Sequence, residues 1–293
     1  AMPTWSALTT LPDKDRAEAL AAAMEAVDPE PTGVGCFEIE DGSGLYEVGV
    51  YFDESPDEIA LALMAAAHGA EPFTVSEVPE TDWVAHVKRN LQPVAAGRFF
   101  VYGSHDAGRV PEGTVPLLIE AAMAFGTGHH ATTLGCLLAL DRLDHEGFRG
   151  RNVADIGCGT AVLGMAAAAI WPDPVIASDI DPLAVEVARA NVEANGLSGR
   201  VTCVEAAGFG HPALAARAPY DLVFANILKG PLIVLAPEMA CAVAPGGIAI
   251  LSGILNSQAE EVTAAYAEAG FSVRSRDEHG DWTTLVLTRG QSL

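Results

Sequence analysis

The chain has 293 residues, of which half are hydrophobic, and its 39 acidic and 16 basic residues give a formal net charge of −23. This length allows one large domain or two ordinary ones. The acidic balance argues against direct nucleic-acid binding, which needs clustered Lys and Arg. It is suited to steering a basic partner, and it is equally consistent with a role in solubility alone.

No signal peptide or apolar run of membrane-spanning length is evident, which predicts a cytoplasmic protein without a membrane partner. The cysteines lack any C-x-x-C pair, as is typical of buried apolar residues in a reducing compartment. They are scattered over five positions, namely Cys36, Cys136, Cys158, Cys203 and Cys241. We expect the protein to be a monomer.

The first 78 residues predict a small α+β domain. Its expected elements are strands over 5–10, 33–40, 45–52 and 73–78, a helix that opens at 12–13 and runs to 27, and a helix over 56–68. Ser55 is the predicted N-cap of the second helix, with Pro56 at its first position. The order βαββαβ is that of a split ferredoxin-like unit, and it contains no catalytic constellation, which favours recognition or docking.

The next residues connect this domain to a second folded unit. A short helix is expected over 82–91, and β-prone residues follow from Phe99. We therefore place the ferredoxin-like domain at 1–78, a linker helix at 79–96 and the second domain at 97–293.

A glycine-dense stretch over 124–133 leads into a helix expected over 134–143. Thr132 or Thr133 is placed to cap that helix, whose free backbone N–H groups would face a carboxylate. Phe125 lies between small residues. This favours a loop that closes over a ligand, with a flexible surface loop as the alternative.

Two adjacent histidines, His129 and His130, stand in the same stretch. They lack the third residue at fixed helical spacing that a metal site needs, so no metal is expected. His130 is interpreted first as a residue that structures the loop, with a proton acceptor near the substrate as the alternative.

The apolar run 153–156 predicts a buried strand that ends in Gly157 and Gly159, before an Ala-rich helix. This geometry lets a ligand lie against backbone at the carboxyl edge of a parallel sheet, where a Cβ would block its approach. The dinucleotide fingerprint needs a third glycine, but Val162 stands there. Because Asp155 before the turn would repel a phosphate, a cationic ligand is favoured.

A second strand, over 175–178, ends in Asp179, whose carboxylate can accept hydrogen bonds from both hydroxyls of a ribose. Asp181 is interpreted as the cap of the following helix, with a second ribose contact as a close alternative. Further strands are expected over 200–205, 220–227, 248–254, 271–276 and 282–288. Helical crossovers between them predict an α/β, seven-stranded, doubly wound sheet with an antiparallel hairpin at one edge.

Several motifs together are similar to those of one family, the ribosomal protein L11 methyltransferases of bacteria. They are Ala124-Phe125-Gly126-Thr127-Gly128-x-His130-x-Thr132-Thr133, Asp179-Ile180-Asp181-Pro182, Asn226-Ile227-Leu228-x-Gly230-Pro231-Leu232, and Leu251-Ser252-Gly253-Ile254-Leu255 followed by Gln258. The D-x-G-x-G turn also resembles the first motif of class I S-adenosylmethionine-dependent methyltransferases. The resemblance implies a Rossmann-like class I methyltransferase domain, preceded by a small domain that recognises the substrate.

The resemblance further implies that S-adenosyl-L-methionine is the cofactor and that a basic ribosomal protein, L11, is the substrate. Methyl groups would go to lysine side chains and the N-terminal amine. Asn226 is the candidate catalytic residue, because its side-chain oxygen would orient the amine. The implied cofactor-binding residues are Phe125, Thr133, Gly157, Gly159, Asp179 and Asn226.

Four residues depart from the family pattern: His129, Ala131, Ala161 and Lys229. Lys229 puts the substrate in doubt, because a cation beside the target site would repel an incoming ammonium, and an effect of His129 on the substrate stays open. One alternative is a class I methyltransferase that acts on another protein lysine or on a small molecule. Another is a non-catalytic adenosyl-binding module or a nucleotide-dependent oxidoreductase, which the missing third glycine disfavours.

Overall fold

The computed structural model describes residues 4–39, 43–78, 93–119 and 130–291. The chain divides into two compact units; the described part of the first is residues 4–39 and 43–78, and that of the second is residues 93–119 and 130–291. The helix expected over 82–91 lies outside the described residues.

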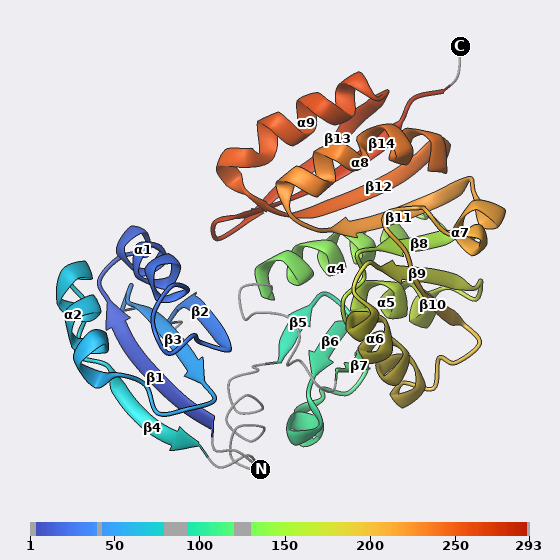
Figure 1. Ribbon diagram of the computed structural model, residues 1–293. Helices are drawn as coiled ribbons and strands as arrows, with labels where there is room; N and C mark the ends of the chain where they lie inside the picture. The colour runs from blue at the N-terminus through green and yellow to red at the C-terminus, as the bar shows by residue number, and fades with distance from the viewer. Residues whose placement is uncertain (1–3, 40–42, 79–92, 120–129, 292–293) are drawn as a thin grey trace. The chain divides into compact units, whose positions relative to one another are not determined.

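The first unit is an antiparallel sheet with the order β2-β3-β1-β4, and two helices cover one of its faces (Figure 1). Its elements are β1 (Thr4–Leu11), α1 (Lys14–Met24), β2 (Gly33–Glu38), β3 (Tyr46–Phe52), α2 (Glu58–His68) and β4 (Thr74–Val78). This order confirms the ferredoxin-like prediction. The core lies between sheet and helices, where alternate residues of β1 and β3 meet Leu20 and Leu61.

Helix α2 begins at a different residue from the one expected. The N-cap is Asp57, whose Oδ1 accepts hydrogen bonds from the backbone N–H groups of Ile59 and Ala60, at 3.0 and 3.2 Å. The prediction of Ser55 as the cap was therefore wrong. A carboxylate at the N-cap also complements the helix dipole.

The second unit contains a seven-stranded sheet with the order β10-β9-β8-β11-β12-β14-β13. The strands are β8 (Val153–Ile156), β9 (Val175–Asp179), β10 (Val201–Glu205), β11 (Tyr220–Asn226), β12 (Val243–Leu255), β13 (Phe271–His279) and β14 (Trp282–Arg289). The first five run parallel, and β14 is antiparallel to both of its neighbours. The doubly wound sheet with a terminal hairpin is confirmed.

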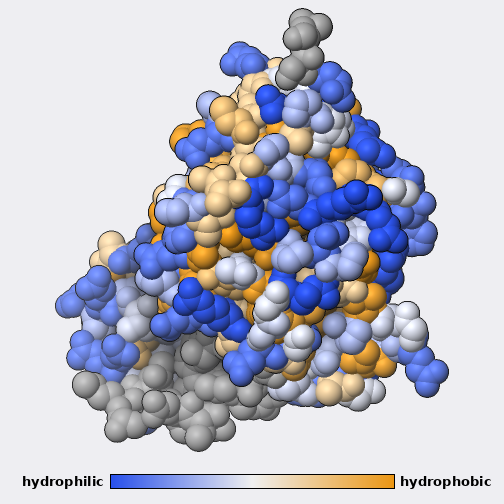
Figure 2. Space-filling view, turned by 90° about the vertical axis from the view of Figure 1, so that its right-hand side faces the viewer, coloured by the Kyte–Doolittle hydropathy of each residue, from blue (hydrophilic) through white to orange (hydrophobic). Residues whose placement is uncertain are grey.

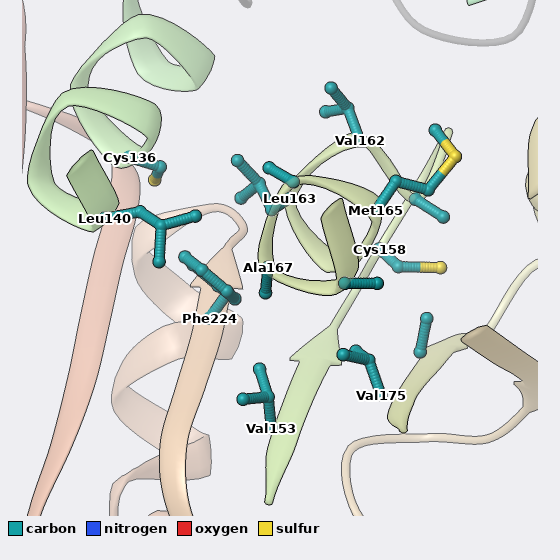
Figure 3. Close-up of a cluster of buried hydrophobic side chains, with 14 of the residues drawn as sticks. Cys136, Leu140, Val153, Cys158, Val162, Leu163, Met165, Ala167, Val175 and Phe224 are labelled. Carbon is teal, nitrogen blue, oxygen red and sulfur yellow. The ribbon is translucent and has the colours of Figure 1, made fainter. Parts of the chain in front are cut away.

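Helices cover both faces of this sheet (Figure 1). One face packs against α4 (His130–His145), α5 (Val162–Ile170) and α6 (Pro182–Ala194). The other packs against α7 (Pro212–Arg217), α8 (Lys229–Ala242) and α9 (Ala259–Glu268). In Figure 3, Phe224 of β11 lies among Leu140 of α4 and Leu163 and Ala167 of α5, which shows how this layer fixes the strands.

A small sheet with the order β5-β6-β7 also belongs to the second unit. Its strands are β5 (Val94–Ala96), β6 (Phe99–Tyr102) and β7 (Val115–Leu118), and the short η1 helix (Ser104–Arg109) precedes β7. The sequence did not predict β5, because three residues are too few to show an alternating pattern. Arg98 ties this sheet to α4 through ion pairs with Asp141 and Asp144.

The surface is mixed in character. Hydrophilic and hydrophobic residues are interspersed over the face of the molecule drawn in Figure 2, as is usual for folded proteins. Among the described helices, none is both long enough and apolar enough to span a bilayer.

Candidate active site

The turn after β8 has a backbone that favours glycine. Gly157 and Gly159 adopt φ values of +68° and +53°, in the left-handed region that side chains rarely enter. A Cβ at Gly157 would also lie 2.3 Å from Cγ2 of Ile227. Gly157 is therefore required both by its backbone conformation and by the close approach of the residue that follows β11.

The acid at the end of β9 is bound to this turn. Asp179 is 9% exposed, and its Oδ2 accepts a hydrogen bond from the backbone N–H of Gly159 at 2.9 Å. Its Oδ1 accepts from the N–H of Asp181 at 3.0 Å. Each carboxylate oxygen can accept more than one hydrogen bond, so the capacity for ribose hydroxyls remains.

The neighbouring acid has a different role. Asp181 is the N-cap of α6, and its Oδ1 accepts from the N–H of Leu183 at 2.9 Å. This confirms the interpretation of Asp181 as a capping residue.

Three of the expected site residues end adjacent strands in register. Ala225 is paired with Ile156, and Ile156 is paired with Ser178. The residues that follow them are Asn226, Gly157 and Asp179. Because parallel strands lie about 4.8 Å apart, these residues share one short edge of the sheet.

Asn226 has a buried oxygen without a hydrogen-bond partner among the described residues. Its Nδ2 donates to Oγ1 of Thr132 at 3.3 Å, which holds the amide in place. Gly253, with φ +85°, leaves space beside the side-chain oxygen of Asn226. A Cβ on Gly253 would lie only 3.0 Å from Oδ1 of Asn226. Buried polar atoms in proteins are nearly always hydrogen-bonded, so this oxygen points to a ligand that donates to it.

The remaining site residues lie near or before α4. Thr133 is in the first turn of α4 and is half-buried, and its neighbour Thr132 is the residue that contacts Asn226. The prediction that Thr132 or Thr133 caps the helix was wrong, because the helix begins at His130. Phe125 and His129 lie outside the described residues, as does the side chain of His130.

Sequence reasoning did not single out Thr132 as a partner of Asn226, although it stood in the stretch noted as a glycine-dense loop. Their side chains are brought together across 94 positions of sequence. Gly253 was part of a quoted motif, but no role was assigned to it. Gly253 lies beside Asn226 because β12 is the neighbour of β11 in the sheet.

The site carries negative charge. Asp155 is 1% exposed, and its Oδ2 accepts from the N–H of Gly164 at 2.9 Å. Burial raises the pKa of Asp155 to about 7, the bond from Gly164 opposes this rise, and the charge of Asp179 adds to it. The charge of Asp179 beside the turn suits a cationic ligand and disfavours a phosphate, and Asp155 adds to this effect only in its ionised form.

The buried thiols near these acids are not prepared for nucleophilic attack. Burial raises the pKa of Cys203 to about 11, and it also raises the pKa of Cys158. Since the thiolate is the reactive form, both groups remain neutral near pH 7.

A pocket of about 650 Å³ adjoins this edge, beside Ile180. Ile180 follows Asp179 directly and is 70% exposed, so it offers an apolar surface to a flat ring. The pocket is lined by Ile180, Arg189, Val204, Glu205, Ala206, Ala207, Gly210 and His211. With the acid for a ribose and the oxygen of Asn226 that has no partner among the described residues, these residues fit an adenosyl cofactor that carries a positive charge.

The lysine that put the substrate in doubt has an acidic partner. Lys229 Nζ lies 2.9 Å from Oε2 of Glu261, on α9. The ion pair offsets the positive charge at the start of α8, which reduces the repulsion expected for an incoming amine.

Comparisons with known proteins agree with this geometry. The family model described as "Ribosomal protein L11 methyltransferase (PrmA)" matches residues 15–290. The chain is 41% identical over 277 residues to the ribosomal protein L11 methyltransferase of Brucella abortus (strain S19), covering 94% of this chain and 96% of that protein. It is 42% identical over 278 residues to that of Chelativorans sp. (strain BNC1), covering 93% and 94%.

A solved structure shows the same fold. The crystal structure of the ribosomal protein L11 methylase from Lactobacillus delbrueckii subsp. bulgaricus aligns with a TM-score of 0.60 and 24% identity. The alignment covers 69% of this chain and 100% of that one.

Proposed function

Because the chain belongs to the ribosomal protein L11 methyltransferase family, we propose that it transfers methyl groups to amines of ribosomal protein L11. It is an S-adenosyl-L-methionine-dependent protein N-methyltransferase. The acceptors in this proposal are lysine side chains and the N-terminal amine. The enzyme acts as a cytoplasmic monomer, and it recognises the protein substrate without direct contact to nucleic acid.

The buried oxygen of Asn226 is the observation that supports this proposal best. When bound, the cofactor supplies a methyl group on a sulfonium, which an amine attacks in line. The amine must be neutral, although the pKa of a free lysine is about 10.4, and transfer into an apolar site lowers that value. Oδ1 of Asn226 accepts one N–H of the amine and thereby directs its lone pair toward the methyl group.

The same edge of the sheet holds the cofactor in this proposal. Asp179 accepts the hydroxyls of the ribose, the backbone at Gly157 and Gly159 allows close approach, and the pocket beside Ile180 takes the base. Thr133, in the first turn of α4, and Phe125 are the further cofactor-binding residues of this proposal. The charge of Asp179 beside the turn favours this cationic cofactor over one that carries phosphate.

The division of labour between the units is also part of the proposed function. Residues 1–78 recognise the substrate, residues 79–96 link the units, and residues 97–293 carry the chemistry. The first 78 residues include 16 acids and only two bases, Lys14 and Arg16, which suits a basic substrate.

Incubation of the full chain with radiolabelled S-adenosylmethionine and purified large-subunit ribosomal proteins tests the proposal. We expect label on L11, and less label on L11 whose N-terminal amine has been acetylated beforehand. Label on other proteins but not on L11 would contradict the substrate assignment. Labelling of small amines alone would favour the small-molecule alternative.

A further inference from the structure

One helix of the first unit exposes a continuous apolar face. Ile59 and Leu63 of α2 are 75% and 67% exposed. They lie one turn apart, on the same side of the helix. The exposed residues of this α2 face are Ile59, Ala62, Leu63, Ala66 and Ala67.

The opposite side of α2 fixes the helix in place. Leu61 and Ala65 are buried against the sheet, Asp57 caps the start, and Gly69 ends the helix in the left-handed conformation. The α2 face is therefore held on a rigid element, so a partner would not have to order it on binding.

The neighbouring helix, α1, shows that an exposed apolar face is not a general property of the helices in this unit. Helices α1 and α2 lie side by side on the sheet (Figure 1). The outer side of α1 carries the charged residues Asp15, Arg16 and Glu18, all exposed. By contrast, no charged residue lies between Glu58 and His68 in α2.

Charge identifies the kind of partner that fits. The α2 face is preceded by exposed acids at Asp53, Glu54 and Glu58. The first 78 residues carry 16 acids against two bases, so a second copy of this chain would meet a surface of the same charge. An apolar centre with a charged rim is the usual anatomy of a binding surface, and here the rim selects a basic protein.

We propose that the α2 face is the docking surface for an apolar patch on the basic ribosomal protein substrate. This inference rests on the proposed function, and it assigns substrate binding to particular side chains of the first unit. Ile59 and Leu63 are the two large side chains that the partner covers, and the acids that precede Ile59 guide its approach.

The double variant Ile59→Gln/Leu63→Gln tests this role in the full chain. Glutamine is a good helix former without charge, so the helix remains and only the apolar contact is lost. We expect KM for L11 to rise about tenfold or more, as is found for central interface residues. The turnover at saturating L11 and the Kd for S-adenosylmethionine should remain close to those of the wild type.

Ala19→Gln/Ala22→Gln is the matched control, because both alanines are exposed on α1. This variant should leave KM for L11 unchanged. An unchanged KM in the α2 variant would overturn the inference while leaving the proposed function intact. Sedimentation that shows a wild-type dimer lost in the α2 variant, with KM unchanged, would assign the face to self-association instead.

A further readout separates docking from a merely structural effect. Binding of L11 should weaken as ionic strength rises in the wild type and in both variants, because the acids remain. The melting temperatures of both variants should match that of the wild type, since the substituted side chains are exposed. A wild-type enzyme that does not methylate L11 at all would contradict the proposed function and this inference together.

Discussion

Gly159 and Asp179 are joined by a hydrogen bond of 2.9 Å, from the backbone N–H of the glycine to Oδ2 of the acid. The turn after β8 and the end of β9 are therefore one structural unit rather than two separate motifs. An acid at this place both holds the turn and offers lone pairs to a ribose. Asp179 is therefore expected to be needed both for the turn and for the cofactor.

Asp179→Ala removes the acceptor of two backbone N–H groups and of the ribose hydroxyls. Because hydrogen bonds to charged groups contribute about 1.5–3 kcal/mol each, we expect the affinity for S-adenosylmethionine to fall about 10- to 100-fold. Isothermal titration calorimetry measures this change. Asp181→Asn is the control, since asparagine still caps α6 and the affinity should be retained.

Gly157→Ala should lower the free energy of unfolding more than Gly196→Ala does, although the two glycines have similar φ angles. At Gly196, with φ +67°, a Cβ would meet no atom of the described residues within 4 Å, so Gly196→Ala should cost only about 1–2 kcal/mol. At Gly157 the new Cβ meets the stiff side chain of Ile227, which adds about 1–3 kcal/mol. Urea unfolding of both variants measures the difference, and equal losses would disprove the close contact.

The buried carboxyl of Asp155 predicts a dependence of stability on pH. Its pKa is about 7 in the folded chain, against an ordinary value of 3.8 that represents the unfolded chain. The folded state therefore binds the proton of Asp155 more tightly than the unfolded chain does. The resulting contribution to the free energy of unfolding is complete below pH 3.8 and is lost as pH rises to about 7. The loss is on the order of 4 kcal/mol, at about 1.36 kcal/mol for each unit of pKa.

Asp155→Asn provides the reference, because it can still accept the N–H of Gly164 and it does not ionise. The free energy of unfolding of the wild type, minus that of the variant, should decrease across this pH range and then level. Urea titrations of the free enzyme at several pH values test this. A difference that increases with pH would show that Asp155 is ionised in the folded chain and stabilised there.

Thiol labelling should distinguish the cysteines by burial. Cys241 is exposed, whereas Cys136, Cys158 and Cys203 are buried, and burial raises the pKa of all three. Ellman's reagent should therefore label Cys241 rapidly, and these three should react only on unfolding. Cys241→Ser should abolish the rapid phase; a rapid phase that persists at full amplitude would contradict the assignment.

Local signals in the sequence were sufficient to predict the glycine turn after β8 and the acid at the end of β9. A short apolar strand followed by Gly157 and Gly159 already indicates the left-handed backbone, and Asp179 follows at the end of the next strand. These features depend on neighbours in the chain. The doubly wound sheet followed from the same regular alternation of strands and helices.

Features that depend on tertiary contacts were missed or misplaced. The strand β12 begins at Val243 and continues through Pro245 and Gly246, although the sequence predicted a strand only from Ile248. A proline and a glycine normally interrupt a strand, but here Tyr220 of β11 pairs with Val243 across an irregular register. The contact of Thr132 with Asn226 likewise depends on the folded sheet.

Kinetics of Asn226→Ala test the central claim most directly, because the buried side-chain oxygen of Asn226 is assigned to the amine. With purified L11, turnover should fall about 100-fold or more, as is found when a group that positions charge in the transition state is removed. The Kd for S-adenosylmethionine should change far less, and the melting temperature should confirm that the variant is folded. Unchanged turnover in a folded variant would contradict the assignment of Asn226 to the amine.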